Sequence, residues 1–365
     1  KYEVGVKDLV YRPNLSFTEI LDPRLAMASL KLDVFKPFDK YVAKYFKHPF
    51  LRKLMEFPIL FLGAMPQDTP ALYSLMNYAD MQLGTWYPMG GMNKIIEAMV
   101  MVAKSQGVKF EVNANVTEIL TENKKAVGIE VNGEKLLCDY VVSGADYHHT
   151  EQKLLKAEFR NYSEKYWNKR TMAPSSLLYY VGLNKKVKGI KHHNLFFDES
   201  FKEHAIEIYD THKWPKKPLF YVCNPSKTDT DIAPEGHENL FFLIPVSTEL
   251  KEDTEEIRTK YFNHICDRLT AHIGEDIRES IVVYETFAHS DFVGEYNSFK
   301  GNAYGLANTL KQTAFLKPKC KNKKLANLFY AGQLTVPGPG VPPSIVSGKI
   351  VSDLILEENS TSQKS

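Results

Sequence analysis

The sequence predicts an α/β fold with two domains or subdomains, and three observations support this prediction. The chain has 365 residues, of which 44% are hydrophobic, so it can build a sizeable core. Strand-like runs alternate with helical patterns along most of its length. Near the C-terminus, a strand-like run at 327–331 is separated from a helix-like run at 344–356 by a turn with three glycines and four prolines.

Charge and cysteine content exclude several classes of function. The 46 basic and 44 acidic residues nearly cancel, which gives no support for a nucleic-acid partner. The four cysteines are widely spaced and contain no CxxC pair, so we expect a reducing, cytoplasmic environment and no zinc site. The longest apolar run, at 57–65, is about half the ~18 to 20 residues that a membrane-spanning helix needs.

Residues 1–84 are predicted to form a mainly helical region that faces the substrate or a membrane. Residues 1–12 look like a strand and a turn, and the stretch SFTEIL at 16–21 has the capping-box spacing between Ser16 and Glu19. Beyond it, prolines divide a helical pattern into short helices. Lysines and aromatic residues interleave after Val34, which is typical of a membrane-surface face and equally of an ordinary solvated surface.

Residues 85–150 are predicted to form part of a cofactor-binding domain. A glycine pair, Gly90 and Gly91, precedes a helix that ends near Gly107, and Asn132-Gly133 is the dipeptide of a type I′ hairpin. Four strand-like runs follow the helix, namely VKFEVN, VTEILTE, AVGIEVN and KLLCDYVVSGAD.

Residues 151–300 are predicted to form a second domain of sheet and helices. We expect a helix from Tyr147 to about Asn168, and a long amphipathic helix over 252–274 that ends at a glycine. The strand-like runs here are SLLYYVGLN, NLFFD, LFYVCN, NLFFLIPVS and SIVVYETFA. Residues 301–357 then return to the first domain, and the polar tail 358–365 is expected to be disordered.

The turn before the last helix has the properties of a seat for a flat anionic ligand. Few side chains cover its backbone, and a helix that starts beyond it directs N–H groups and a positive dipole end at a ligand. A reduced flavin ring fits this description, and a rigid structural turn is the alternative. Gly338 and Gly340 mimic a dinucleotide fingerprint, but its third glycine is replaced by Pro343.

Three motifs carry a resemblance to a known family. These are NLFYAGQLTVPGPGVPPSIVSGKIVSDLI near the end, TWYPMGGMNKIIEAMVMVAKSQGVKFEVNANVTEI in the middle, and DTDIAPEGHENLFFLIPVS between them. Together they resemble the bacterial phytoene desaturase family, the carotenoid desaturases of the FAD-dependent amine oxidase superfamily. The resemblance spans residues 10–357. It implies a two-domain oxidoreductase with a Rossmann-like FAD domain and a substrate domain of mixed sheet and helices.

The resemblance also implies which residues meet the cofactor. In the last motif these are the flavin-ring positions Gly332, Gly338, Gly340, Val341 and Pro342. Others are the glycine pair Gly90 and Gly91, and Val116, whose backbone matches the position at the adenine end of FAD. A tight turn before a helix and an ordinary strand core are the structural alternatives for the glycine pair and for Val116.

Family members begin with a strand, a GxGxxG turn and a helix that bind the FAD pyrophosphate. This chain begins at Lys1 and has no such segment, so we expect it to be an N-terminally truncated, inactive fragment that binds FAD weakly. In some members an acidic and a basic residue in an SFxDxLR-like stretch are proposed to assist the reaction. Glu19 occupies the acidic position, although Asp22 replaces the arginine, and a capping role is the stronger interpretation of Glu19.

The predicted function is the FAD-dependent removal of hydrogens from a long linear polyene such as phytoene, with peripheral contact to a membrane. A carotenoid isomerase or later-step desaturase, a non-catalytic prenyl-binding escort protein and an amine oxidase are the alternatives. The histidine pairs His148-His149 and His192-His193 have neither helical metal-site spacing nor a neighbouring carboxylate cluster. We therefore predict no metal site.

Overall fold

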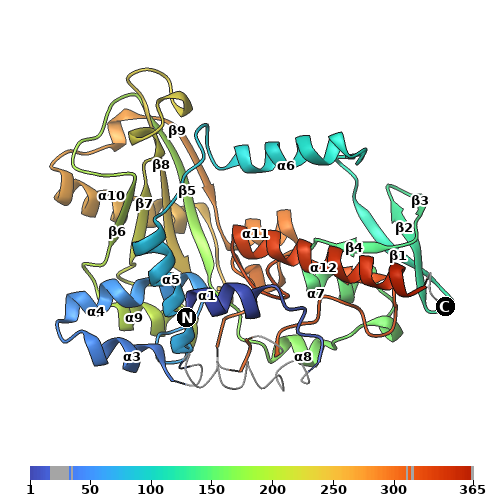
Figure 1. Cartoon of the computed structure of the whole chain (residues 1–365). Helices are drawn as coiled ribbons and strands as arrows, with labels where there is room; N and C mark the ends of the chain where they lie inside the picture. The colour runs from blue at the N-terminus through green and yellow to red at the C-terminus, as the bar shows by residue number, and fades with distance from the viewer. Residues whose placement is uncertain (17–32, 34–35, 310, 314–315, 363–365) are drawn as a thin grey trace.

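The structure is a computed structural model that describes residues 1–16, 33, 36–309, 311–313 and 316–362. A five-stranded sheet with its helices forms one end of the molecule, and two small sheets with the C-terminal helix form the other (Figure 1). The helices are α1 (Tyr2–Val4), α3 (Phe38–Tyr45), α4 (Pro49–Glu56), α5 (Leu75–Tyr78), α6 (Asn93–Ser105), α7 (Tyr147–His149), α8 (Glu164–Asn168), α9 (Phe201–Ala205), α10 (Glu255–Ile273), α11 (His289–Tyr296) and α12 (Val341–Ser362).

The strands form three sheets. They are β1 (Val116–Glu122), β2 (Lys125–Val131), β3 (Glu134–Leu137), β4 (Val141–Ser143), β5 (Ser175–Leu183), β6 (His193–Phe196), β7 (Phe220–Cys223), β8 (Glu238–Val246), β9 (Ile281–Phe287) and β10 (Leu328–Tyr330). The large sheet is antiparallel, in the order β6-β7-β8-β5-β9. The sheet β1-β2-β3 is an antiparallel meander, and β10 pairs with β4 in parallel.

The large sheet buries one face and leaves the other partly open. Side chains alternate along β8, so that every second residue is buried against α10, as period-two patterning requires. On α10, Phe262, Ile265 and Leu269 pack into this core. On the opposite face, Tyr180 is 47% exposed and its ring lies 5.3 Å from that of Phe241. This open face is the surface that the candidate site uses.

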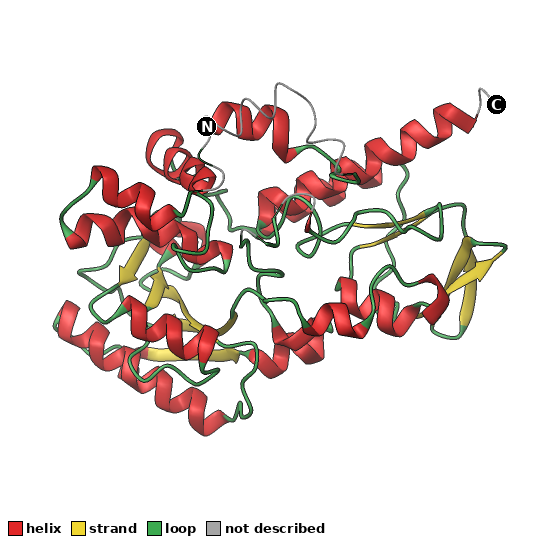
Figure 2. Cartoon of the chain, turned by 90° about the horizontal axis from the view of Figure 1, so that it is seen from below, coloured by secondary structure: helices red, strands yellow, loops and turns green. Residues whose placement is uncertain are grey.

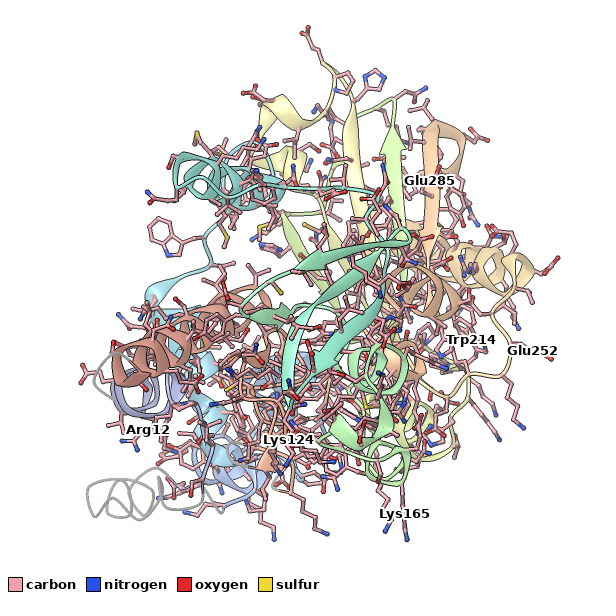
Figure 3. The ribbon with its side chains drawn as sticks, turned by 90° about the vertical axis from the view of Figure 1, so that its right-hand side faces the viewer. Arg12, Lys124, Lys165, Trp214, Glu252 and Glu285 are labelled. Atoms are coloured by element: carbon pink, nitrogen blue, oxygen red, sulfur yellow. The ribbon has the colours of Figure 1, made fainter. Side chains whose placement is uncertain are left out.

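The long helix α10 confirms the prediction for 252–274. Its first turn is capped by the Thr254 hydroxyl, which accepts from the Ile257 amide, and it ends at Gly274 in the left-handed conformation. Trp214 holds the chain just before α10, because its indole N–H donates to the Glu252 carbonyl at 2.8 Å. Figure 3 shows both residues at the rim of the molecule.

The meander at the other end confirms the predicted hairpin. Asn132 and Gly133 have φ values of 51° and 83°, and both must be positive in a type I′ turn. Beside it, a second core surrounds Tyr147, Trp167 and Tyr330, and the Tyr147 and Tyr330 rings stack at 3.9 Å. This core supports the β4–β10 pair and therefore the turn that follows β10.

Several predictions of secondary structure differ from the structure. Residues 2–10 are helical rather than extended, because Tyr2 packs its ring on Tyr78 of α5, at 5.2 Å. The predicted strand VKFEVN at 108–113 is a loop. The expected helix over 147–168 is divided into a helical run at 147–154, a 3₁₀ turn at 157–159 and α8, since the buried Glu151 carboxylate accepts the amides of Asn161 and Tyr162.

The C-terminal helix is longer than predicted at both ends. It starts at Val341 and continues to Ser362, so most of the tail expected to be disordered is helical. Figure 2 shows α12 projecting from the body of the molecule toward the C-terminus. Within the described part of the chain, no helix has both the length and the apolar character needed to cross a membrane.

Candidate functional site

The glycine-rich turn begins where two parallel strands end. Tyr330 is the register partner of Ser143, and the Ala331 amide donates to the Ser143 carbonyl at 2.9 Å. Gly144 follows Ser143, and Gly332 follows Ala331. Ligands of α/β proteins bind outside the carboxyl ends of parallel strands, so this edge is the expected position for a cofactor.

The backbone of this turn is bare because its geometry requires glycine. Gly332 has φ of 111° and Gly340 has φ of 106°, values that side chains disfavour. A β-carbon on Gly332 would lie 4.0 Å from the Gly144 carbonyl oxygen. A planar ligand can therefore approach the peptide groups of both segments.

One side chain joins the turn to the helix that leaves it. The Gly332 amide donates to the Ser347 hydroxyl at 2.8 Å, and that hydroxyl donates to the Ser344 carbonyl at 2.7 Å. Ser347 is fully buried in α12. The start of the turn and the first turns of α12 are thus held in one fixed arrangement.

The first turn of α12 offers fewer donors than an ordinary helix. Pro342 and Pro343 have no N–H, and the Ser344 amide already donates to the Gly340 carbonyl at 3.0 Å. Of the first three helical residues, Val341 alone therefore carries an amide for a ligand. The helix attracts negative charge mainly through its dipole.

A buried lysine lies under the turn. Lys317 is 2% exposed, and its Nζ lies 3.2 Å from the position that a β-carbon on Gly338 would take. No hydrogen-bond partner of Nζ lies among the described residues, and burial lowers the pKa of Lys317 to about 8. An unpaired buried ammonium is costly, so this position favours a negative charge nearby. Together with the bare backbone and the helix dipole, it fits a flavin that becomes anionic on reduction.

A second segment connects the turn to the open face of the large sheet. A β-carbon on Gly305 would lie 2.8 Å from the Gln333 carbonyl oxygen, so these backbones are in direct contact. Asn302 Oδ1 accepts from the Gly305 amide at 2.7 Å and from Gln333 Nε2 at 3.3 Å. The residue before Gly305, Tyr304, lines an apolar pocket over the sheet, whose other walls include Phe57, Leu195, Phe197, Tyr221 and Leu243.

The sequence profile of the family described as flavin containing amine oxidoreductase matches residues 18–356, which is nearly the whole chain. The chain belongs to this family. The membership confirms the predicted fold class and the flavin cofactor, FAD. The Gly332–Pro342 turn, with the Lys317 ammonium beneath it, stays the predicted seat of the flavin ring.

Relatives of known function agree with this membership. A carotenoid 3,4-desaturase of Haloarcula japonica is 36% identical over 98% of this chain and 72% of its own length. A phytoene desaturase of Neurospora crassa is 31% identical, over 98% of this chain and 62% of its own length. A 4,4'-diapophytoene desaturase of Staphylococcus haemolyticus is 30% identical, over 98% of this chain and 73% of its own length. The family resemblance inferred from the three motifs is thereby confirmed.

Solved structures share the fold at lower identity. An oxidoreductase from Methanosarcina mazei superposes with a TM-score of 0.59 and 16% identity, over 93% of this chain and 74% of that one. A putrescine oxidase variant superposes with a TM-score of 0.54 and 12% identity, over 97% of this chain and 73% of that one. At such identities the likeness concerns the fold alone.

The structure brings together only part of the residues predicted to bind the flavin. Gly332, Gly338, Gly340, Val341 and Pro342 lie together in one turn. The pair Gly90-Gly91 lies in the connection to α6, where the Gly90 amide donates to Asp229 Oδ2 at 2.6 Å. Within the described ranges, no hydrogen bond joins this pair to the turn, so its contact with FAD stays a prediction.

Val116 and Glu19 also stay predictions. Val116 is partly buried at the start of β1, where it pairs with Val131 and packs against the core around Tyr147. Glu19 falls outside the described residues. The structure therefore gives no placement for a carboxylate at that position.

Lys317, Gly144 and the segment Asn302–Gly305 were not identified from the sequence. Lys317 lies among Lys319, Lys321 and other lysines, so its sequence pattern indicates a solvated surface. Gly144 had a usable signal, because VVSGAD places a glycine directly after a strand-like run, as in many ligand-binding turns.

Proposed function

We propose that this protein is an FAD-dependent desaturase of a long linear carotenoid. The observation that carries the proposal is the contact between the cofactor turn and an apolar pocket, through Tyr304 and Gly305. An apolar pocket suits a polyene, since the pocket walls offer aromatic and aliphatic side chains and few charges. The names of the relatives support the same substrate class.

The protein's part in this chemistry is positioning and charge. A bound flavin would supply a hydride acceptor, and a base or water would take the proton from the neighbouring carbon. The pocket beside Tyr304 has a volume of about 40 Å³, so it would contact a short apolar segment of the substrate rather than its whole chain. The Lys317 ammonium and the dipole of α12 would stabilise the negative charge that reduction brings to the ring.

A later-step desaturation is the second candidate function. The relative that is 36% identical is named a carotenoid 3,4-desaturase, whereas the fungal relative at 31% is named a phytoene desaturase. Both reactions remove hydrogen from a polyene on the same fold. The two candidates differ in the substrate that the pocket accepts.

We also propose that the α3–α4 region contacts the cytoplasmic surface of a membrane. Four apolar side chains there are 45% to 72% exposed, namely Tyr45, Phe50, Leu51 and Leu54. Exposed lysines flank them at Lys36, Lys40, Lys44 and Lys47. Exposed apolar groups with lysines around them are typical of peripheral membrane binding. A substrate that hardly dissolves in water gives such contact a purpose.

The decisive experiment is expression of the full-length protein in two hosts, one that accumulates phytoene and one that accumulates a more desaturated carotenoid. Pigments are extracted and identified by absorption and mass. A product that is two mass units lighter than the host's carotenoid, for each double bond introduced, supports a desaturase. The host in which this product forms decides between the two candidates. Unchanged carotenoids in both hosts, from a protein that contains stoichiometric flavin, would refute the proposal.

A further inference from the structure

The edge of the large sheet brings together three side chains that bind metals in other proteins. His193 on β6 is the register partner of Cys223 on β7, and His192 directly precedes β6. One ring nitrogen of each histidine and the Cys223 sulfur all lie within 4.8 Å of one another. The two imidazole rings have centroids 4.3 Å apart. Separations of this order can contract around a single ion by small side-chain rotations.

A hydroxyl group contacts one ring nitrogen of each imidazole. The Thr228 hydroxyl lies 2.6 Å from His192 Nδ1, and the Tyr221 hydroxyl lies 2.5 Å from His193 Nδ1. Tyr87 packs edge-on against His192, with ring centroids 4.9 Å apart. Metal-binding histidines are commonly oriented in this way, because a hydrogen bond at one ring nitrogen presents the other nitrogen to the ion.

We propose that His192, His193 and Cys223 bind one thiophilic metal ion, with Zn²⁺ as the preferred ion. Two imidazoles and one thiolate are ligands of Zn²⁺, and three protein ligands leave a fourth position for water. A site without carboxylates disfavours Mg²⁺ and Ca²⁺, which require oxygen ligands. The proposal is independent of the carotenoid reaction.

The site has a defined place in the fold. A bound ion would link the edge strand β6 to β7. The site lies beside Tyr221, which also lines the apolar pocket. The sequence could not indicate it, because Cys223 lies 30 positions after His193 and only strand pairing brings them together. The spacing of the two adjacent histidines alone therefore indicated no metal site.

The test is a metal titration of the flavin-loaded protein after chelator treatment. Zn²⁺ is added in competition with a chromophoric chelator, and Co²⁺ is added separately to detect thiolate-to-metal charge-transfer absorption. We expect one equivalent of each ion, with a cobalt spectrum of a thiolate-containing site. Cys223→Ser and His193→Ala should lose at least tenfold in affinity, and Tyr221→Phe about tenfold through the lost hydrogen bond to His193.

Cys138→Ser is the matched control, because Cys138 is an exposed cysteine outside the cluster and should leave binding unchanged. Unaltered protein provides a second measurement. Zn²⁺ should slow alkylation of Cys223 but not of Cys138, as read by peptide mass spectrometry. Equal Zn²⁺ affinity in the parent and in Cys223→Ser, or equal alkylation of Cys223 with and without Zn²⁺, would overturn the proposal.

Discussion

The Nζ of Lys317 lies 3.2 Å from the place where a β-carbon on Gly338 would be, so the turn proposed to hold the flavin rests on a buried amine. Replacing that amine separates its electrostatic role from its packing. Lys317→Met keeps the volume and removes the charge, and such a change in a buried site is commonly neutral or stabilising. We expect an unchanged or higher melting temperature.

The same variant should make the flavin harder to reduce. Loss of ~1.4 kcal/mol of charge stabilisation corresponds to ~30 mV for a two-electron couple, so we expect the midpoint potential to fall by tens of millivolts. The potential is measured by dye-linked reduction of the flavin-loaded protein. Lys349→Met is the control, since Lys349 is an exposed residue of α12 that pairs with Asp353. An equal potential in the parent and Lys317→Met would show that the lysine does not act on the flavin.

Gly340→Val should lose flavin. Gly340 has φ of 106°, and its β-carbon would lie 3.4 Å from Pro343 Cδ, so valine strains the backbone and covers the turn. The flavin-to-protein ratio after gel filtration measures the effect. Gly348→Ala, within α12 and with open space at its β-carbon, is the matched change, and it should retain flavin and stabilise the helix by up to about 1 kcal/mol. Normal flavin in Gly340→Val would leave the turn with a structural role only.

Glu151 should make stability depend on pH. Burial raises the pKa of this carboxyl from 4.5 to about 7, although the amides of Asn161 and Tyr162 partly oppose the shift. Between these two pH values the folded protein holds a proton that the unfolded chain has lost. The free energy of unfolding should therefore decrease as the pH rises from about 4.5 to 7. Glu151→Gln should flatten this dependence, as thermal melts at pH 5, 6 and 7 would show. An equally steep decline in the variant would assign it to other groups.

Charge reversal of Lys36, Lys40, Lys44 and Lys47 to Glu should weaken membrane binding. Each surface lysine contributes about 1 kcal/mol of attraction to anionic lipid, so four reversals remove most of it. Co-sedimentation with vesicles that contain anionic lipid measures the bound fraction. The control reverses four exposed lysines near the β1–β3 meander, namely Lys109, Lys124, Lys125 and Lys135. Equal loss of binding in both sets would indicate a general charge effect rather than a contact through α3 and α4.

Local signals in the sequence predicted local structure well. Asn132-Gly133 required positive φ angles and formed the hairpin, and the amphipathic pattern of 252–274 formed α10. The glycines and prolines of 332–343 likewise indicated a rigid turn between a strand and a helix. In each of these cases the determining interactions lie within a few residues of one another.

Features that depend on distant contacts escaped prediction. Residues 2–10 became helical through packing on α5, and Glu151 divided an expected helix by accepting amides ten and eleven residues away. Lys317 is buried by the surrounding fold, whereas its sequence neighbourhood indicates a solvated lysine. Likewise, only the β6–β7 pairing places Cys223 beside His193.

If the Gly332–Pro342 turn holds the flavin as proposed, the backbone contact between Gly305 and Gln333 would link a ligand in the pocket beside Tyr304 to the surroundings of the isoalloxazine. The visible absorption of that ring responds to small changes of polarity and hydrogen bonding. The yellow colour of the enzyme can thus serve as an optical gauge of pocket occupancy. Candidate polyenes of different lengths could be ranked by spectral titration under anaerobic, non-turnover conditions, before any product is analysed.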